Sequence, residues 1–94
     1  MYLILINYIQ PIDVVDQHLA DHREFLGKGY DKDYFVVSGP KNPREGGIII
    51  SQLKDKDQLQ KIIEQDPFFV NKIASYEIIE FSPVKYHPNF SSFI

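Results

Sequence analysis

Two polar side chains stand at positions where a helical pattern asks for aliphatic ones. His22 falls inside the apolar stripe of an amphipathic helix, whose other members recur at the helical period: Ile12, Val15, Leu19, Phe25 and Leu26. Asp66 continues the stripe of a second helix, formed by Leu59, Ile62 and Ile63. Burying an ionisable group costs free energy unless the group has a polar partner, and such groups gather at functional sites. The two residues therefore predict a site.

Histidine and aspartate together are the residue types of general acid–base catalysis. An imidazole ordinarily titrates near neutral pH, and a carboxylate partner would fix its tautomer and stabilise its charged form. Each residue also has a purely structural interpretation. His22 could be a core histidine bonded to one backbone carbonyl, while Asp66, directly before Pro67, has the sequence of a helix N-cap. The capping and catalytic roles of Asp66 are compatible.

Four further residues are candidates for holding a ligand: Ser38, Gly39, Pro40 and Arg44. Ser38 could donate a hydrogen bond to a substrate, Gly39 could expose its backbone N–H, and Arg44 could hold an anion. A solvated loop arginine is the commoner case for Arg44. Catalysis by Ser38 as a nucleophile is disfavoured, because no strained nucleophile elbow surrounds it.

The two remaining histidines carry weaker signals. His18 lies at the edge of the first helical stripe, four residues before His22, and this spacing can chelate a cation. No companion ligand pattern supports the pair, so we predict neither a metal nor a cofactor. His87, beside Pro88, is expected at the surface.

The elements that must position these residues follow from apolar runs and chain breakers. Strands are predicted at 2–7, 35–38, 48–53 and 76–81. Helices are predicted from residue 12 to Gly27 and Gly29, with Asp13 as the cap, and over 57–65, with a further helical turn over 68–73. The tail over 84–94 is rich in aromatic residues, which favours docking onto the domain.

The resulting βαββαβ order predicts an α+β, ferredoxin-like fold, in which two helices lie on one face of a four-stranded antiparallel sheet. In this arrangement the end of the second strand and the end of the second helix lie at the same edge. Ser38 and Gly39 should therefore approach Asp66, whereas the position of the His22 ring relative to that carboxylate is left open.

The strands are apolar on both faces, as in the run Leu3 to Ile6 and the run Ile48 to Ile50. Two helices can cover only one face. Leaving the other face in water would forgo several kcal/mol, at about 25 cal/mol per Å² of apolar area. The simplest solution is a homodimer whose sheets meet face to face. The alternative is that the aromatic tail folds back over the second face.

The 94 residues are enough for a single domain, 1–94, with a modest core. The formal net charge of -3 gives no basic field and argues against a nucleic-acid partner. Cysteine is absent, which excludes disulfides and thiolate sites and is compatible with a reducing cytoplasm. The apolar opening, Met1 to Ile6, lacks a basic region and is too short for a membrane span. We therefore expect a cytoplasmic protein without a membrane partner.

Four blocks, in order, resemble the YciI-like (YCII-related) family: HREFL from His22, SGP from Ser38, NPREGG from Asn42, and DPF from Asp66 followed by ASYEIIEFSPV. The resemblance covers nearly the whole chain. It implies a ferredoxin-like subunit of the dimeric α/β barrel type and a His–Asp active site formed by His22 and Asp66. Many members look to have an arginine three residues before the histidine. That position is Leu19 here, which puts an anion-anchoring role there in doubt.

The sequence thus predicts a homodimer whose subunits each have a small pocket between helices and sheet. The pocket would bind a small cyclic or anionic metabolite. His22 would perform general acid–base chemistry, as in isomerisation, elimination or hydrolysis, and Asp66 would orient it. The competing hypothesis is a non-catalytic module for ligand binding or assembly, in which both residues are structural.

Overall fold

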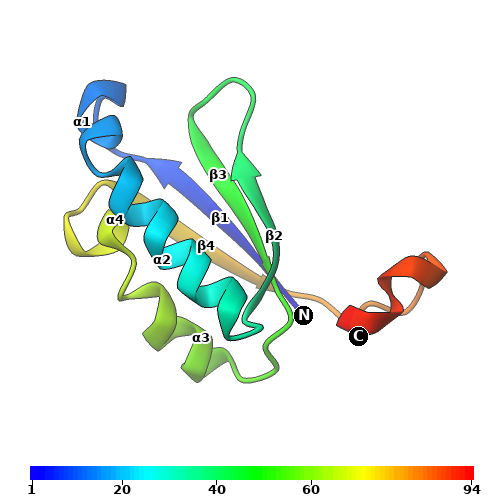
Figure 1. Ribbon diagram of the computed structural model, residues 1–94. Coiled ribbons are helices and arrows are strands. Elements are labelled where there is room, and N and C mark those ends of the chain that lie inside the picture. The colour runs from blue at the N-terminus through cyan, green and yellow to red at the C-terminus, as the bar shows by residue number, and fades with distance from the viewer.

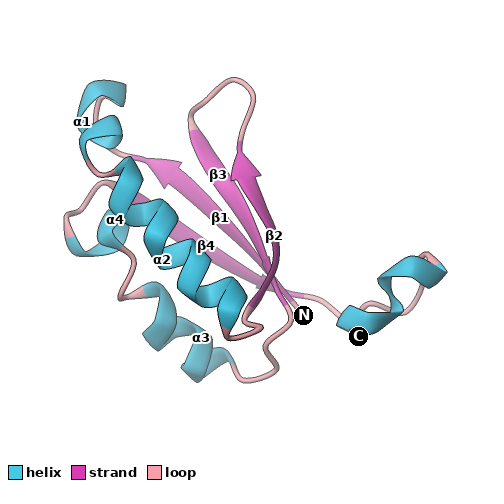
Figure 2. Ribbon diagram, viewed as in Figure 1, coloured by secondary structure: helices cyan, strands magenta, loops and turns pink.

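The computed structural model describes residues 1–94 and has the predicted βαββαβ order (Figures 1 and 2). Its antiparallel sheet has the strand order β2-β3-β1-β4. The strands are β1 (Tyr2–Tyr8), β2 (Phe35–Pro40), β3 (Gly46–Ser51) and β4 (Ala74–Glu80). The helices are α1 (Ile12–Gln17), α2 (Leu19–Asp31), α3 (Lys56–Ile63), α4 (Pro67–Val70) and the 3-10 helix η1 (Pro88–Phe93). The first four helices lie on one face of the sheet (Figure 1), which confirms the ferredoxin-like α+β fold.

The hydrophobic core lies between that face and the helices. Alternate residues of β1 point into it, because successive strand side chains face opposite ways, and Tyr2, Ile4 and Ile6 are almost fully buried. The other core residues are Val15, Phe35, Ile49, Leu59, Ile63, Phe68, Ile73 and Ala74. None of the helices combines the length and the apolar composition that a membrane crossing needs.

The opposite face of the sheet is apolar and is not covered by the helices. Its central pair is Leu3 and Ile50, with Val37 and Ile79 on the flanking strands. Val37 is 50% exposed and Ile79 is 39% exposed. The doubly apolar strands therefore leave one face of the single chain open to solvent.

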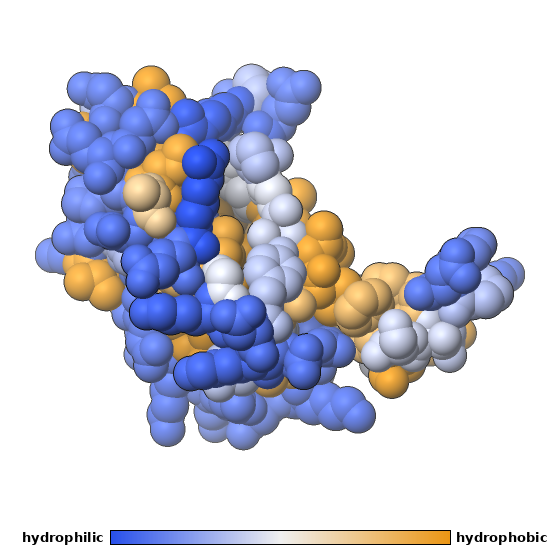
Figure 3. Space-filling model, in the orientation of Figure 1, coloured by the Kyte–Doolittle hydropathy of each residue, from blue (hydrophilic) through white to orange (hydrophobic).

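The tail does not dock onto the domain, so this prediction is wrong. Beyond β4 it projects away from the body (Figure 1), and its side chains are largely exposed, with Val84 at 89%. The space-filling view shows apolar atoms where the tail leaves the body (Figure 3). Inside the tail, the rings of Phe90 and Phe93 contact each other, and His87 Nδ1 accepts from the Asn89 backbone N–H. The aromatic residues of the tail therefore pack against each other and do not cover the sheet.

The first predicted helix is divided into two. His18 leaves the helical conformation and separates α1 from α2, a break too local for a periodic pattern to reveal. Asp13 is not the cap of α1, because Pro11 takes that position and its carbonyl accepts the first helical N–H groups. The end of the helix also differs, since α2 continues through Gly27 and Gly29 to Asp31.

Gly29 serves packing and does not terminate the helix. No glycine in the chain has a positive φ, the conformation through which glycine usually ends helices. A Cβ on Gly29 would instead collide with the buried ring of Phe35, whereas nothing lies within 4 Å of a Cβ on Gly27. The absent side chain at Gly29 lets α2 approach β2 closely.

We predict opposite effects for alanine at these two glycines. Gly29→Ala should lower the free energy of unfolding by about 1–3 kcal/mol, because the Phe35 ring must move. Gly27→Ala, in the same helix, should raise it by up to about 1 kcal/mol through helix propensity. Urea denaturation of both variants measures the difference. Equal effects would contradict the close packing of α2 against β2.

Candidate active site

Asp66 is held rigidly between α3 and α4. Its carboxylate caps α4, with Oδ1 accepting from the Phe68 backbone N–H at 3.0 Å and Pro67 in the first turn of that helix. This is the capping role that the aspartate–proline sequence predicts. The side chain is fully buried, so its remaining lone pairs require donors from within the protein.

Two side chains supply those donors. Nδ1 of His22 lies 2.8 Å from Oδ1 of Asp66, and the Tyr76 hydroxyl donates to Oδ2 at 2.6 Å. Since Oδ1 and Oδ2 act as acceptors, Nδ1 of His22 must carry the hydrogen of their bond. Burial, together with the adjacent Asp66 carboxylate, raises the pKa of Tyr76 above its ordinary value. Tyr76 therefore stays protonated and remains a donor.

Aromatic packing fixes the plane of the His22 ring. The imidazole stacks on Phe68 with ring centroids 4.0 Å apart and an interplanar angle of 3°, and Phe25 lies beside it at 6.4 Å. The backbone N–H of the same Phe68 donates to Asp66, so one residue positions both members of the pair. His22 is held by its edge through Asp66 and by its face through Phe68.

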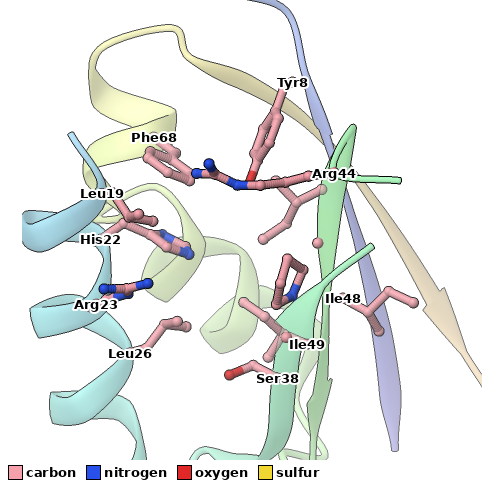
Figure 4. A pocket seen from close by; sticks show the side chains of 14 residues that line it. Tyr8, Leu19, His22, Arg23, Leu26, Ser38, Arg44, Ile48, Ile49 and Phe68 are labelled. Atoms are coloured by element: carbon pink, nitrogen blue, oxygen red, sulfur yellow. The ribbon is translucent and has the colours of Figure 1, made fainter. Parts of the chain in front are cut away.

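The second ring nitrogen of His22 is free. Every fully buried side-chain nitrogen or oxygen has a hydrogen-bond partner, and Nε2 of His22 has none within the protein. Nε2 is therefore accessible from the cavity that the residue lines (Figure 4). The neutral ring presents a lone pair at this nitrogen, so the arrangement is chemically able to accept a proton there.

The cavity, of about 500 Å³, lies between α2 and strands β2 and β3 (Figure 4). Its size suits a small organic molecule. The residues that line it are Ile6, Tyr8, Leu19, His22, Arg23, Leu26, Ser38, Gly39, Pro40, Arg44, Gly47, Ile48, Ile49 and Phe68.

The structure brings the predicted ligand-holding residues to this cavity. Ser38, Gly39 and Pro40 lie in β2 and not in a turn after it, because the strand runs on to Pro40. The Ser38 hydroxyl is 2.7 Å from the Tyr30 hydroxyl. Ser38 and Gly39 do not hydrogen-bond to Asp66, whose carboxylate accepts from His22, Tyr76 and the Phe68 backbone N–H.

Arg44 reaches the cavity from the loop between β2 and β3. Its guanidinium donates to Asp16 at 2.6 Å and lies over the Tyr8 ring, 5.9 Å from the centroid. The bond to Asp16 raises the pKa of Arg44, and both contacts hold the side chain at the rim. The loop arginine is thus tethered and is not freely solvated.

His18 and His87 lie outside the pair. His18 separates α1 from α2, and His87 caps η1 in the projecting tail. The structure contains no group of three or more histidine, cysteine, aspartate or glutamate residues that could hold a metal ion.

Three residues of the site were not predicted from the sequence: Arg23, Phe68 and Tyr76. Tyr76 could have been found, because it alternates with Ala74 and Ile78 on the helix-facing side of β4. Phe68 resembles an ordinary core residue, and Arg23 resembles an ordinary solvated residue of an amphipathic helix, so sequence offered no signal for their roles.

The profile of the YCII-related domain family matches residues 1–82. The fold resembles 5-chloro-2-hydroxyhydroquinone dehydrochlorinase (TftG) from Burkholderia phenoliruptrix AC1100, solved in complex with 2,5-dihydroxybenzoquinone. The TM-score is 0.72 at 18% identity, covering 87% of this chain and 94% of the other, a likeness of fold. A search of curated proteins finds no match.

Proposed function

We propose that this chain, which belongs to the family of YCII-related domains, is a small-molecule enzyme that transfers protons through Nε2 of His22. The observation that carries the proposal is the 2.8 Å bond between His22 Nδ1 and the buried Asp66 carboxylate. A carboxylate bonded to Nδ1–H leaves Nε2 as the basic nitrogen and stabilises the imidazolium once Nε2 has taken a proton. A general base that must later act as an acid needs both effects.

Elimination from a small ring compound is the reaction that best suits this site. Support comes from the likeness to TftG, a dehydrochlorinase whose structure holds 2,5-dihydroxybenzoquinone. Nε2 would take a proton from the substrate, the freed electron pair would form the new double bond, and the leaving group would depart with its bonding electrons. The imidazolium would then return its proton to the leaving group or to solvent, so the substrate loses one H–X. Isomerisation would use the same two proton transfers without a leaving group.

The ligand is held, in this proposal, by residues on the wall opposite His22. Ser38 can offer its hydroxyl and Gly39 its backbone, while Pro40 closes the wall of the cavity. Arg44, tethered by Asp16, is placed to bind an oxygen of the ligand without first losing much side-chain freedom.

A crystal structure with 2,5-dihydroxybenzoquinone tests this function at the level of the site. The expected result is a quinone in the cavity of His22, with one of its atoms within hydrogen-bond distance of Nε2. The bond from Nδ1 to Asp66 should be unchanged. A quinone bound only elsewhere, or bound with the His22 ring turned away from it, would count against the proposal.

The functional unit is proposed to be a homodimer that joins the open sheet faces. The support is the uncovered apolar surface around Leu3, Val37 and Ile50, and the tail that leaves this face exposed. Burying such a face contributes about 25 cal/mol for each Å² of apolar area, which favours association over exposure.

A charge at the centre of that face should abolish the dimer. Ile50→Glu would place a carboxylate between Leu3 and Val37, where a second sheet would desolvate it. We expect light scattering to give twice the chain mass of 11.0 kDa for the wild type and a single chain mass for this variant. Val70→Glu, at an exposed position of α4 on the helix-covered side, is the matched control and should remain dimeric. A monomeric wild type would refute the interface.

A further inference from the structure

The ionisable residues that line the cavity differ in sign from the net charge of the chain. The chain carries 13 acidic and 10 basic residues, for a net charge of -3. The cavity nevertheless has two arginines, Arg23 and Arg44, and no aspartate or glutamate among its lining residues. Two carboxylates bond to lining residues: Asp16 pairs with Arg44, and Asp66 is fully buried behind His22 and bonded to three donors. The lining of the cavity therefore offers a ligand cationic side chains and no carboxylate, which favours an anion.

The two arginines differ in whether the guanidinium already has a partner within the protein. Arg44 is paired with Asp16 at 2.6 Å, which offsets much of its charge. The guanidinium of Arg23 makes no hydrogen bond and no salt bridge in the structure, although the residue lines the cavity and directly follows His22 on α2. In Figure 4 the ring nitrogens of His22 lie between the guanidinium of Arg23 and the guanidinium of Arg44. Arg23 is thus the unneutralised cation of the cavity.

We propose that Arg23 is the anion-binding residue of this cavity and that the ligand is a small cyclic organic anion. A guanidinium presents a planar fork of donors that matches two oxygens of a carboxylate or of adjacent ring oxygens. The anionic oxygen lies on Arg23, and the ring lies in the cavity beside His22. The position of the reacting atom rests on the proposed function of His22, because that function requires the atom to face Nε2. The binding of the anion itself depends on Arg23 alone.

Benzoate and benzamide are matched probes for this site, because they share a ring and a planar head group and differ in charge. Binding is followed by NMR titration of the wild-type protein and of Arg23→Gln, which keeps a long polar side chain without the charge. Lys28→Gln is the control variant. It removes one positive charge from the exposed surface of the same helix, where Lys28 pairs with Glu24.

The wild type should bind benzoate at least about tenfold more tightly than benzamide, because a hydrogen bond to a charged group is worth about that much. Arg23→Gln should weaken benzoate binding by about tenfold and leave benzamide binding within about twofold. Lys28→Gln should change neither affinity by more than about twofold. Arg23→Lys should recover part of the benzoate affinity, because the charge returns without the fork.

The inference is overturned if the wild type does not bind benzoate or binds both probes equally, or if Arg23→Gln leaves benzoate affinity unchanged. The proposed function is judged separately, by whether turnover depends on His22. If turnover requires His22 but Arg23→Gln leaves the benzoate affinity unchanged, the anion site alone is rejected. If the preference for benzoate over benzamide requires Arg23 but turnover is unchanged without His22, the proposed function alone is rejected.

Discussion

His22→Gln is expected to lower turnover by about 10²–10⁴-fold while the protein stays folded. The glutamine amide can still donate a hydrogen bond toward Asp66, so the buried carboxylate keeps a partner. It has no group that accepts and returns a proton at neutral pH, and the lone pair that Nε2 presents to the cavity is lost. The measurement is steady-state turnover of an identified substrate, with the free energy of unfolding determined on the same sample.

His18→Gln is the matched control, because it makes the same substitution one helical turn away, at the break between α1 and α2. It should retain turnover within about threefold of the wild type, since His18 does not line the cavity. Unchanged turnover in a folded His22→Gln variant would favour a non-catalytic binding module. Loss of turnover accompanied by unfolding would show His22 to be structural.

Asp66→Ala is expected to lower the free energy of unfolding by about 3–5 kcal/mol, because each buried donor left without an acceptor costs about 1–3 kcal/mol. Three donors lose their acceptor at once: Nδ1–H of His22, the Tyr76 hydroxyl and the backbone N–H of Phe68. Water cannot replace the lost carboxylate without moving the surrounding side chains, because Asp66 has no exposed surface. Urea denaturation gives the value, and loss of the cap should also destabilise α4.

Tyr76→Phe supplies the comparison. It removes one of the three donors and leaves the carboxylate bonded to His22 and Phe68, so we expect a loss of about 1–2 kcal/mol. A smaller effect from Asp66→Ala than from Tyr76→Phe would contradict the view that Asp66 organises the site. Turnover should fall in both variants, and more steeply without Asp66, because the orientation of His22 then loses its anchor.

The sequence identified the two polar members of the site through one physical signal, a polar residue within an apolar helical stripe. That signal works because burial of His22 and Asp66 must be compensated, and it needs no knowledge of the partner. The signal could not predict that the two residues are in contact, because they are 44 positions apart in the sequence. Their contact depends on how α2 packs against the sheet, and neither the break at His18 nor the close approach at Gly29 was predicted from the sequence.

Other features depend on packing that local patterns do not encode. The end of the first helix was predicted at Gly27 and Gly29 because glycine often terminates helices, yet here the missing side chain makes room for Phe35. Arg23 has the exposure and polarity of an ordinary surface residue. Only the arrangement of α2 against β2 and β3 turns it toward a cavity.

The nitrogen NMR spectrum of the His22 side chain in the unliganded protein tests directly whether Asp66 sets the tautomer of His22 and leaves Nε2 free to take a proton. We expect the neutral ring to carry its hydrogen on Nδ1, in a bond that Asp66→Ala abolishes. Nε2 should be the unprotonated nitrogen, and its resonance should shift when a ligand fills the cavity. A neutral ring protonated on Nε2, or a ring whose spectrum is indifferent to Asp66, would contradict this expectation.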